Sequence, residues 1–408
     1  MQSAAPGIAI NLFKTRNFLF FVAVLLMHWT LPRPAPADIV FMAVLYLSIV
    51  INPTINSRFL VFFMLVMVWT LSIFISSIHV IDVPAVQFQL LAHTFVVLLG
   101  MTACFAALSW GEGDFHSFMK VYLVACCITA SLGIFGFAVN FDYFLWDGRA
   151  KALFDEPIAF GAFLLPGALG GMYMLSRGEG RIFPFIALTL CTVGVLLSFS
   201  RAAIFSLFVF APLYYIVLHR RNLAQAGAYM LIVLVVASAI LLLAFLSFDG
   251  FQAKVLDRLT VSKDYDVGQG GRFSRYFMSI PMILENPLGL GMLEIEKYFT
   301  EPVHDIFISS FVNYGWLAGV AWILLTLLTF RIAFDNQRAT QSPVAMWLSF
   351  SLLSQLPCAI LQQVEHWRHM WIFFGLVWGL NFRKFPTPAP AMSRAQFNPP
   401  PQLRMERP

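Results

Sequence analysis

Charged side chains are scarce in this 408-residue chain, at 12% of all residues, whereas soluble domains carry about 25%. Apolar residues make up 59% of the chain and fall into long uncharged runs, and the mean hydropathy is +0.77. So little charge cannot cover a water-facing surface, which excludes a soluble globular domain. Uncharged apolar runs of this length are typical of membrane-spanning helices. We therefore predict an all-α integral membrane protein.

Cysteine motifs with C-x-x-C spacing and clusters of metal ligands are also lacking. The five cysteines fall inside apolar runs and have no C-x-x-C spacing, which argues against a disulfide framework or a cysteine metal site. His366 and His369 have an H-x-x-H spacing, but no third ligand lies near them in the sequence. We expect no metal and no cofactor.

The net charge of +5 raises the question of a nucleic-acid partner. Most of the lysines and arginines lie in short loops between the apolar runs, where membrane topology explains them. The sequence therefore predicts a membrane-lipid environment and no nucleic-acid partner.

The apolar runs predict about twelve membrane spans. The first run follows Lys14 and Arg16 and resembles a signal peptide, with Ala35-Pro36-Ala37 in the place of a cleavage site. We expect a retained helix instead, because the charge distribution described next requires it. The spans are expected at residues 18–31, 38–52, 59–78, 88–109, 118–140, 158–175, 182–199, 202–218, 227–248, 305–330, 344–362 and 369–382.

Basic residues set the expected orientation. With a cytoplasmic N-terminus and alternating spans, the cytoplasmic loops hold twelve lysines and arginines and the short external loops hold five. Because basic residues collect in cytoplasmic loops, both termini should be cytoplasmic.

Two segments lie outside the predicted spans. Residues 249–304 form one long external loop, and its stretch FSRYFMSIPMILENP has helix-like apolar spacing up to Pro287. Loops of this length inside a compact fold are usually functional. The proline-rich tail at 385–408 should be a disordered cytoplasmic segment. Residues 1–384 would then form one polytopic transmembrane domain.

Several arginines lie outside the membrane on the external side, against the topology rule. They flank predicted helix ends on that side, and the planar guanidinium fork is suited to phosphate. This pattern suggests a site for an anionic lipid headgroup, a phosphate or a pyrophosphate. Alternatively, the arginines pair with neighbouring carboxylates or bind bulk phospholipid, and spacing alone does not decide between these. The arginines are Arg149, Arg201, Arg272, Arg275 and Arg368, and the candidate carboxylates are Asp147, Asp155, Glu156 and Glu365.

The glycines of VGQGGRFSRYF (267–277) do not form a dinucleotide fingerprint, because residue 273 is phenylalanine and no βαβ pattern surrounds them. They favour a close-approaching backbone that directs Arg272 at its target. Arg275 follows three residues later, so on a helix it would share a face with Arg272.

His304 lies in EPVHDIF, beside Asp305, where the long loop re-enters the membrane. A neutral imidazole there could act as a general base toward a hydroxyl, with a carboxylate setting its orientation. The alternative is an interfacial histidine whose ring is hydrogen-bonded to the backbone.

Charge is nearly absent from the middle of the predicted spans. Ion-coupled transporters place carboxylates or lysines near the bilayer midplane, whereas here the charges collect at one face. This distribution favours chemistry at the membrane surface on a lipid-linked substrate. A transporter or flippase for the same substrate is the alternative.

The run GGRFSRYFMSIPMILENPLGLGMLEIEKYF, followed by VHDIFISSFVNYGWLAGVAW, resembles the shared core of the O-antigen ligase and bacterial polysaccharide polymerase family. The shared elements are an arginine after glycine, the E-N-P-L-G-L-G turn (285–291), a histidine and the Y-G-W-L-A-G stretch (314–319). SFSRAA (198–203) and LFDEPIAFGAFLLP (153–166) are similar to two further elements. Asp305 stands where many members have asparagine.

The resemblance implies a metal-independent, inverting glycosyl transfer at the periplasmic face of a bacterial inner membrane. The donor would be a glycan on undecaprenyl pyrophosphate. Arg201 and Arg272 would hold the pyrophosphate, and His304 would activate the acceptor hydroxyl. Further substrate-binding candidates on the same face are Arg149, Arg275 and Arg368.

Three acceptors fit this resemblance. A ligase would use lipid A–core, a polymerase would use a second lipid-linked glycan, and a third option is a protein. We favour the ligase because nothing in the sequence marks a second lipid-pyrophosphate site.

Overall fold

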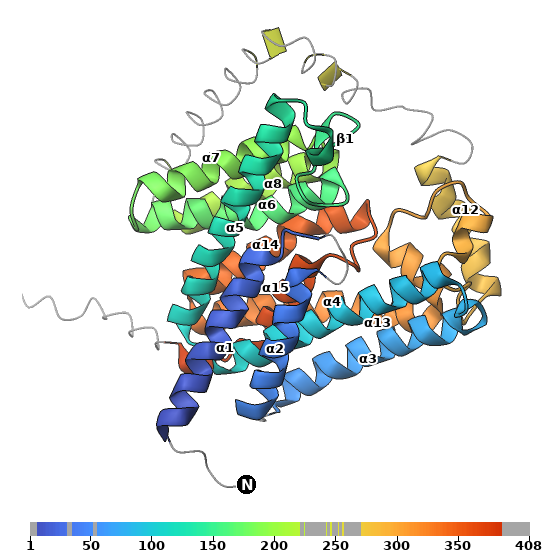
Figure 1. Ribbon diagram of the computed structural model, residues 1–408, viewed down its shortest axis with the longest axis horizontal. Coiled ribbons are helices and arrows are strands. Elements are labelled where there is room, and N and C mark those ends of the chain that lie inside the picture. Colours follow the sequence, from blue (N-terminus) through green and yellow to red (C-terminus); the bar gives the residue numbers. More distant parts are fainter. Residues whose placement is uncertain are drawn as a thin grey trace, which may run out of the picture.

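The computed structural model describes residues 6–30, 35–51, 55–220 and 271–385, together with a few single positions between 221 and 270 (Figure 1). Most of this part is helical, and seven of its helices are long and apolar enough to cross a membrane. The expected class of helical membrane protein is thus confirmed. The span predicted at 227–248, most of the first half of the long loop, and the tail after residue 385 lie outside the described residues.

Every predicted span in the described part falls on a helix. The starts of α4, α6 and α14 each carry a proline in the first turn, where its missing N–H costs no hydrogen bond. The helix α1 begins earlier than predicted and α13 ends later. The helices are α1 (Pro6–Leu26), α2 (Pro36–Ile51), α3 (Ser57–Ser77), α4 (Pro84–Ser109), α5 (Glu112–Ala138), α6 (Pro157–Arg177), α7 (Ile182–Leu197), α8 (Arg201–Leu218), α12 (Arg272–Glu285), α13 (Ile306–Thr340), α14 (Pro343–Ile360) and α15 (Arg368–Gly379).

The core of the bundle is rich in tryptophan. Trp69 of α3, Trp322 of α13 and Trp371 of α15 are buried, with ring centroids 5.2 to 5.8 Å apart. The helix α15 also packs closely against α4, because a Cβ atom on Gly375 would lie only 2.1 Å from the carbonyl oxygen of Gly100. Small residues at such contacts let membrane helices approach each other.

The linkers at one end of the bundle contact each other across long sequence separations. In the α1–α2 linker, the hydroxyl of Thr30 donates a hydrogen bond to the carbonyl of Leu153 in the α5–α6 linker, at 2.6 Å. At the start of α15, Arg368 pairs with Asp38 at the start of α2. The linkers that the sequence assigned to the external side therefore meet here.

The linkers assigned to the cytoplasmic side meet at the opposite end. Ser109, at the end of α4, accepts a hydrogen bond from Arg16 of α1 at its hydroxyl (2.6 Å) and one from Lys384 at its carbonyl (2.8 Å). Ser342, before α14, donates to the carboxylate of Glu112 at the start of α5 at 2.6 Å.

The helix α13 is broken at Gly315, whose φ of 85° and ψ of 178° are not helical. A break leaves backbone groups without helical partners, and the turn after α12 supplies partners for them. The amide of Leu290 donates to the carbonyl of Val312 at 2.9 Å, and the amide of Gly291 donates to the carbonyl of Asn313 at 2.8 Å. The E-N-P-L-G-L-G turn (285–291) is thus the hydrogen-bond partner of the break in α13.

Gly289 makes this contact possible. Its φ is +87°, and a Cβ atom there would lie 2.5 Å from both the carbonyl oxygen of Asn313 and the amide nitrogen of Gly315. Only glycine fits both the conformation and the space. The turn fixes the segment that follows it, which carries His304 to the start of α13.

Candidate functional site

A cavity of about 540 Å³ lies at the end of the bundle where the predicted external linkers meet. Arg149, Arg201, Arg272 and His304 all line it. They come from four separate segments: the strand β2 (Arg149–Ala150), the start of α8, the start of α12 and the α12–α13 linker. The structure therefore brings together four of the six residues that the sequence suggested for the site.

Three helices begin at this cavity. The residues Glu156 to Ile158 at the start of α6, Ser200 to Ala202 at the start of α8, and Arg272 and Phe273 at the start of α12 all line it. The free N–H groups at a helix start carry partial positive charge and favour anions. Arg201 and Arg272 are the first residues of their helices. Their charge adds to that of the helix ends, so the wall favours a group with several negative charges.

Arg149 is positioned by a small hairpin of β1 (Leu145–Trp146) and β2 (Arg149–Ala150). The Asp147-Gly148 turn between them has positive φ at both residues, as a two-residue hairpin turn requires. Arg149 then donates its Nε hydrogen to the carbonyl of Ser198, at 3.0 Å. The all-α prediction missed this hairpin, although an Asp-Gly pair between short apolar stretches is its usual sequence signal.

His304 lies with its ring largely buried between α12 and α13. Its carbonyl accepts a hydrogen bond from the hydroxyl of Tyr276 at 2.7 Å, and its Nε2 lies 3.8 Å from a carboxylate oxygen of Glu301. The pKa of His304 is lowered to about 4. Burial is the largest cause, the positive charges of Arg272 and Arg275 act in the same direction, and Glu301 opposes them. At neutral pH the imidazole is therefore uncharged and can accept a proton.

Asp305 does not orient the imidazole. Its carboxylate accepts a hydrogen bond from the amide of Ile308 at 2.7 Å and so caps α13. The carboxylate beside the His304 ring belongs to Glu301 instead.

Glu156 and Gln362 are site residues that the sequence reasoning did not assign. Both line the cavity, and the side-chain amide of Gln362 donates a hydrogen bond to the carboxylate of Glu156. Gln362 also lies near His304 and favours the charged imidazole, which raises the pKa of His304. Burial raises the pKa of Glu156, with Arg149 and Arg272 acting in the opposite direction. The sequence signal that could have pointed to Glu156 is its position directly before Pro157, because a proline in the first turn marks the start of a helix.

Arg275 does not line the cavity, although it is three residues from Arg272. Its side chain is buried and turned toward the α12–α13 linker. One Nη donates to the carbonyls of Glu301 and Pro302 at 2.7 and 3.1 Å, and the other pairs with the Glu301 carboxylate at 2.9 Å. Arg275 therefore holds the segment next to His304.

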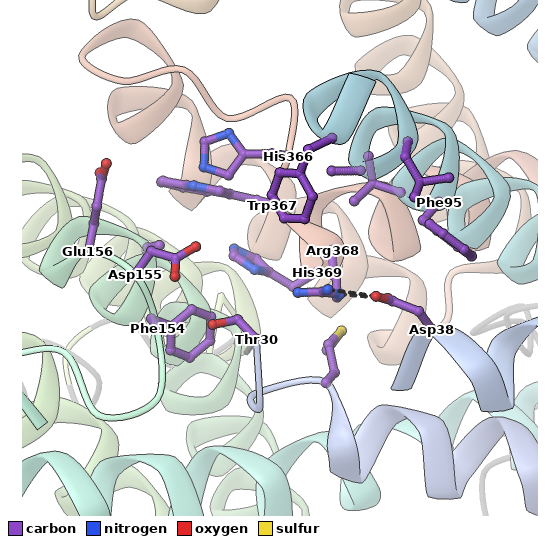
Figure 2. Close-up of a pocket in the computed structure, with 16 residues that line it drawn as sticks. Thr30, Asp38, Phe95, Phe154, Asp155, Glu156, His366, Trp367, Arg368 and His369 are labelled. Atoms are coloured by element: carbon purple, nitrogen blue, oxygen red, sulfur yellow. Dashed lines mark hydrogen bonds and ion pairs between the residues drawn. The ribbon is translucent and has the colours of Figure 1, made fainter. Parts of the chain in front are cut away.

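Arg368 lies in a different part of the same end of the bundle. Figure 2 shows its guanidinium directed at Asp38, where Nε and Nη2 each lie 2.7 Å from one carboxylate oxygen. The pair lines a small cavity of about 50 Å³ together with Asp155, Glu156 and His366. Asp38 was not among the partners that the sequence offered for this arginine.

Within the described part of the chain, no group of three histidine, cysteine or acidic side chains is arranged to hold a metal ion. The positive charge around the cavity comes from the arginines and the helix starts.

Residues 186–323 match a family model described as O-antigen ligase. The matched residues run from α7 into α13 and include Arg201, Arg272 and His304. The family match supports a role in glycan transfer during O-antigen or polysaccharide assembly. A search of curated proteins finds no match to the chain.

Proposed function

We propose that this protein transfers a glycan from undecaprenyl pyrophosphate to an acceptor hydroxyl, as an O-antigen ligase with lipid A–core as the acceptor. The observation that carries the proposal is the single cavity lined by Arg149, Arg201, Arg272 and His304. A pyrophosphate needs several positive groups around it, and a hydroxyl nucleophile needs a base within reach. This cavity offers both.

The outer face of α12 supports a donor that is carried by a lipid. Phe273, Phe277, Ile280 and Leu284 recur at helical spacing, and all four are exposed, Phe277 at 75% and Leu284 at 65%. The face of α12 toward the protein is polar, since Arg275 and Ser279 are buried there. A helix with an apolar outer stripe lies at a membrane interface. Arg272, at its start, would then meet a pyrophosphate whose lipid tail remains in the bilayer.

The proposed reaction is a direct displacement. The acceptor oxygen attacks the anomeric carbon, the bond from that carbon to the pyrophosphate oxygen breaks, and the hydroxyl proton passes to His304. Attack from the side opposite the leaving group inverts the anomeric configuration. The leaving pyrophosphate gains negative charge as the bond breaks, so Arg201 and Arg272 stabilise the transition state without a metal ion.

Donor binding should also make His304 a stronger base. Burial and the charges of Arg272 and Arg275 lower the pKa of His304 to about 4. A bound pyrophosphate would offset the charge of Arg272 and add negative charge nearby, both of which favour the imidazolium. The base would then gain strength only once the donor is in place.

We place the cavity at the periplasmic face of the bacterial inner membrane, with both termini in the cytoplasm. The distribution of basic residues supports this orientation, as do the contacts between linkers at each end of the bundle. Arg275 and Arg368 would act as positioning residues, because carboxylates already hold their guanidinium groups.

Transfer by the purified protein in detergent tests the proposal, with undecaprenyl-pyrophosphate glycan as donor and lipid A–core as acceptor. Arg272→Ala should lower kcat by roughly 100- to 1,000-fold, the usual effect of removing one transition-state donor, and His304→Ala should abolish measurable transfer. Arg331→Ala is the matched control, because Arg331 is exposed and pairs with Asp335 on its own helix. Full transfer by both cavity variants would refute the site.

The products separate the alternatives. Glycan on lipid A–core indicates a ligase, and lengthened lipid-linked chains indicate a polymerase. Movement of the donor across vesicles with no new glycosidic bond would instead identify a flippase.

A further inference from the structure

Another cavity, of about 310 Å³, lies next to the 540 Å³ cavity that Arg272 and His304 line. We call the 540 Å³ cavity the first cavity and the 310 Å³ cavity the second. The two have Glu156 and Pro302 in common. The second cavity is bounded by α4, by the α5–α6 linker, by the segment that follows the E-N-P-L-G-L-G turn, by the break in α13 and by the α14–α15 linker. Its polar lining residues are Gln89, His93, Asp155, Glu156, Glu296, Asn313, Tyr314, Gln363, Glu365 and His366.

The two cavities differ in charge. Three arginines line the first, whereas no arginine or lysine is among the described residues that line the second. Asp155, Glu156, Glu296 and Glu365 give the second cavity four carboxylates. A phosphate would be repelled there, and a neutral or amino group would not.

Two deeply buried acceptor atoms line the second cavity without a hydrogen-bond donor in the described part of the chain. They are Oε2 of Glu365 and Oδ1 of Asn313, on residues only 3% and 4% exposed. Buried acceptor atoms are nearly always hydrogen-bonded, because burying an acceptor without a donor costs folding free energy. Burial, with a smaller contribution from neighbouring Glu156, raises the pKa of Glu365 to about 7. Both atoms can therefore accept a hydrogen bond from a ligand in this cavity.

We propose that the second cavity binds the acceptor glycan, and that it selects a sugar with free hydroxyl or amino groups and no phosphate beside the reacting hydroxyl. Sugar hydroxyls would donate hydrogen bonds to Glu365 and Asn313. Glu156, on the common wall, lies where the acceptor would reach toward the donor and His304. The inference rests on the proposed function, since it assigns the second substrate of the same reaction.

Two acceptors that differ by one group test this selection. They are lipid A–core with an unmodified terminal hexose and the same molecule with a phosphate on that hexose. Wild-type protein should bind and use the unmodified acceptor better. Glu365→Gln keeps the shape but removes the charge, and Asn313→Ala removes the second acceptor atom. Each should raise KM for the acceptor by roughly tenfold or more, the usual effect of losing a hydrogen bond to a buried group, with KM for the donor unchanged.

Asp82→Asn is the matched control, because Asp82 is an exposed carboxylate between α3 and α4. It should change neither KM. Glu365→Gln should also narrow the preference for the unmodified acceptor. Fluorescence anisotropy of a labelled acceptor measures the same selection without turnover, and thermal unfolding confirms that each variant is folded.

The possible failures are distinguishable. If wild-type protein transfers glycan but Glu365→Gln changes neither acceptor binding nor the preference, or changes KM for the donor instead, the acceptor assignment is wrong. If wild-type protein binds the unmodified acceptor selectively but transfers nothing to it, the binding inference holds and the proposed function fails. Absence of both binding and transfer overturns both.

Discussion

Arg368 and Asp38 form a two-point ion pair between segments 330 residues apart, with each guanidinium–carboxylate contact at 2.7 Å. The pair joins the start of α15 to the start of α2, and both side chains are almost completely buried. Removing one member of a buried pair leaves the other charge without a partner.

Arg368→Ala should therefore lower the free energy of unfolding by about 3–5 kcal/mol, measured by thermal unfolding in detergent. Transfer per folded molecule should fall much less than it does for Arg272→Ala. The double variant Arg368→Met/Asp38→Leu should recover much of the lost stability, because it removes both charges. If the single variant is as stable as wild type but cannot bind donor, Arg368 belongs to the donor site.

Arg275 and Glu301 provide a second test. Two of the hydrogen bonds from Arg275 reach backbone carbonyls and one reaches the Glu301 carboxylate. Arg275→Ala should therefore lower kcat more than Glu301→Gln does, because only the first change frees the backbone next to His304. Thermal unfolding and kinetics of both variants check this order. Equal losses in the two variants would show that the side-chain pair alone positions the segment.

The pH dependence of transfer follows from His304. Its pKa is lowered to about 4, so the neutral base is present above that pH and is lost as the pH falls through it. The groups that face its ring are Arg272, Arg275, Glu301 and Gln362. The acidic limb of kcat/KM, which reports the free enzyme, should lie near pH 4.

The acidic limb of kcat should lie at a higher pH, because this parameter reports the complex in which the pyrophosphate offsets Arg272. Profiles at limiting and saturating donor give the two limbs. Coincident limbs would mean that donor binding does not change the base.

The contact between Gly289 and Gly315 predicts a large effect of a single methyl group. Gly289→Ala would combine a φ of +87° with a Cβ atom 2.5 Å from backbone. It should lower the unfolding temperature and the rate of transfer together. Gly113→Ala is the control, since a Cβ atom there meets nothing within 4 Å and alanine favours the helix by about 1 kcal/mol. A wild-type unfolding temperature in Gly289→Ala would contradict the close approach.

The helix positions could be predicted well because long apolar runs and helix-starting prolines are local signals. The break in α13 could not. Gly315 and Gly319 are spaced as a helix-packing pair, and the sequence does not show that Gly315 has a positive φ. The break depends on hydrogen bonds from Leu290 and Gly291, which belong to another segment. Its partners are therefore set by tertiary structure.

In the candidate site, too, local sequence patterns predict some features and tertiary contacts decide the others. The topology rule singled out external arginines, and the structure gathers Arg149, Arg201 and Arg272 in one cavity with His304. Helical spacing suggested that Arg275 would accompany Arg272, but the nearby Glu301 carboxylate and linker carbonyls hold it elsewhere. No local pattern could have shown that Asp38 would hold Arg368.

Because α13 is broken at Gly315, the stretch from Ile306 to Tyr314 is a short helical segment of fixed length. Its far end is held at Gly315 by the turn after α12, and its near end carries His304. Each residue in an α-helix adds about 1.5 Å and about 100° of rotation. Adding or deleting one residue in this segment would move the imidazole to another side of the cavity, while Arg149, Arg201 and Arg272, which lie on other segments, would stay in place. Only a change of three or four residues, about one helical turn, would point the imidazole in its original direction. The number of residues between Gly315 and His304 therefore sets the direction of the base.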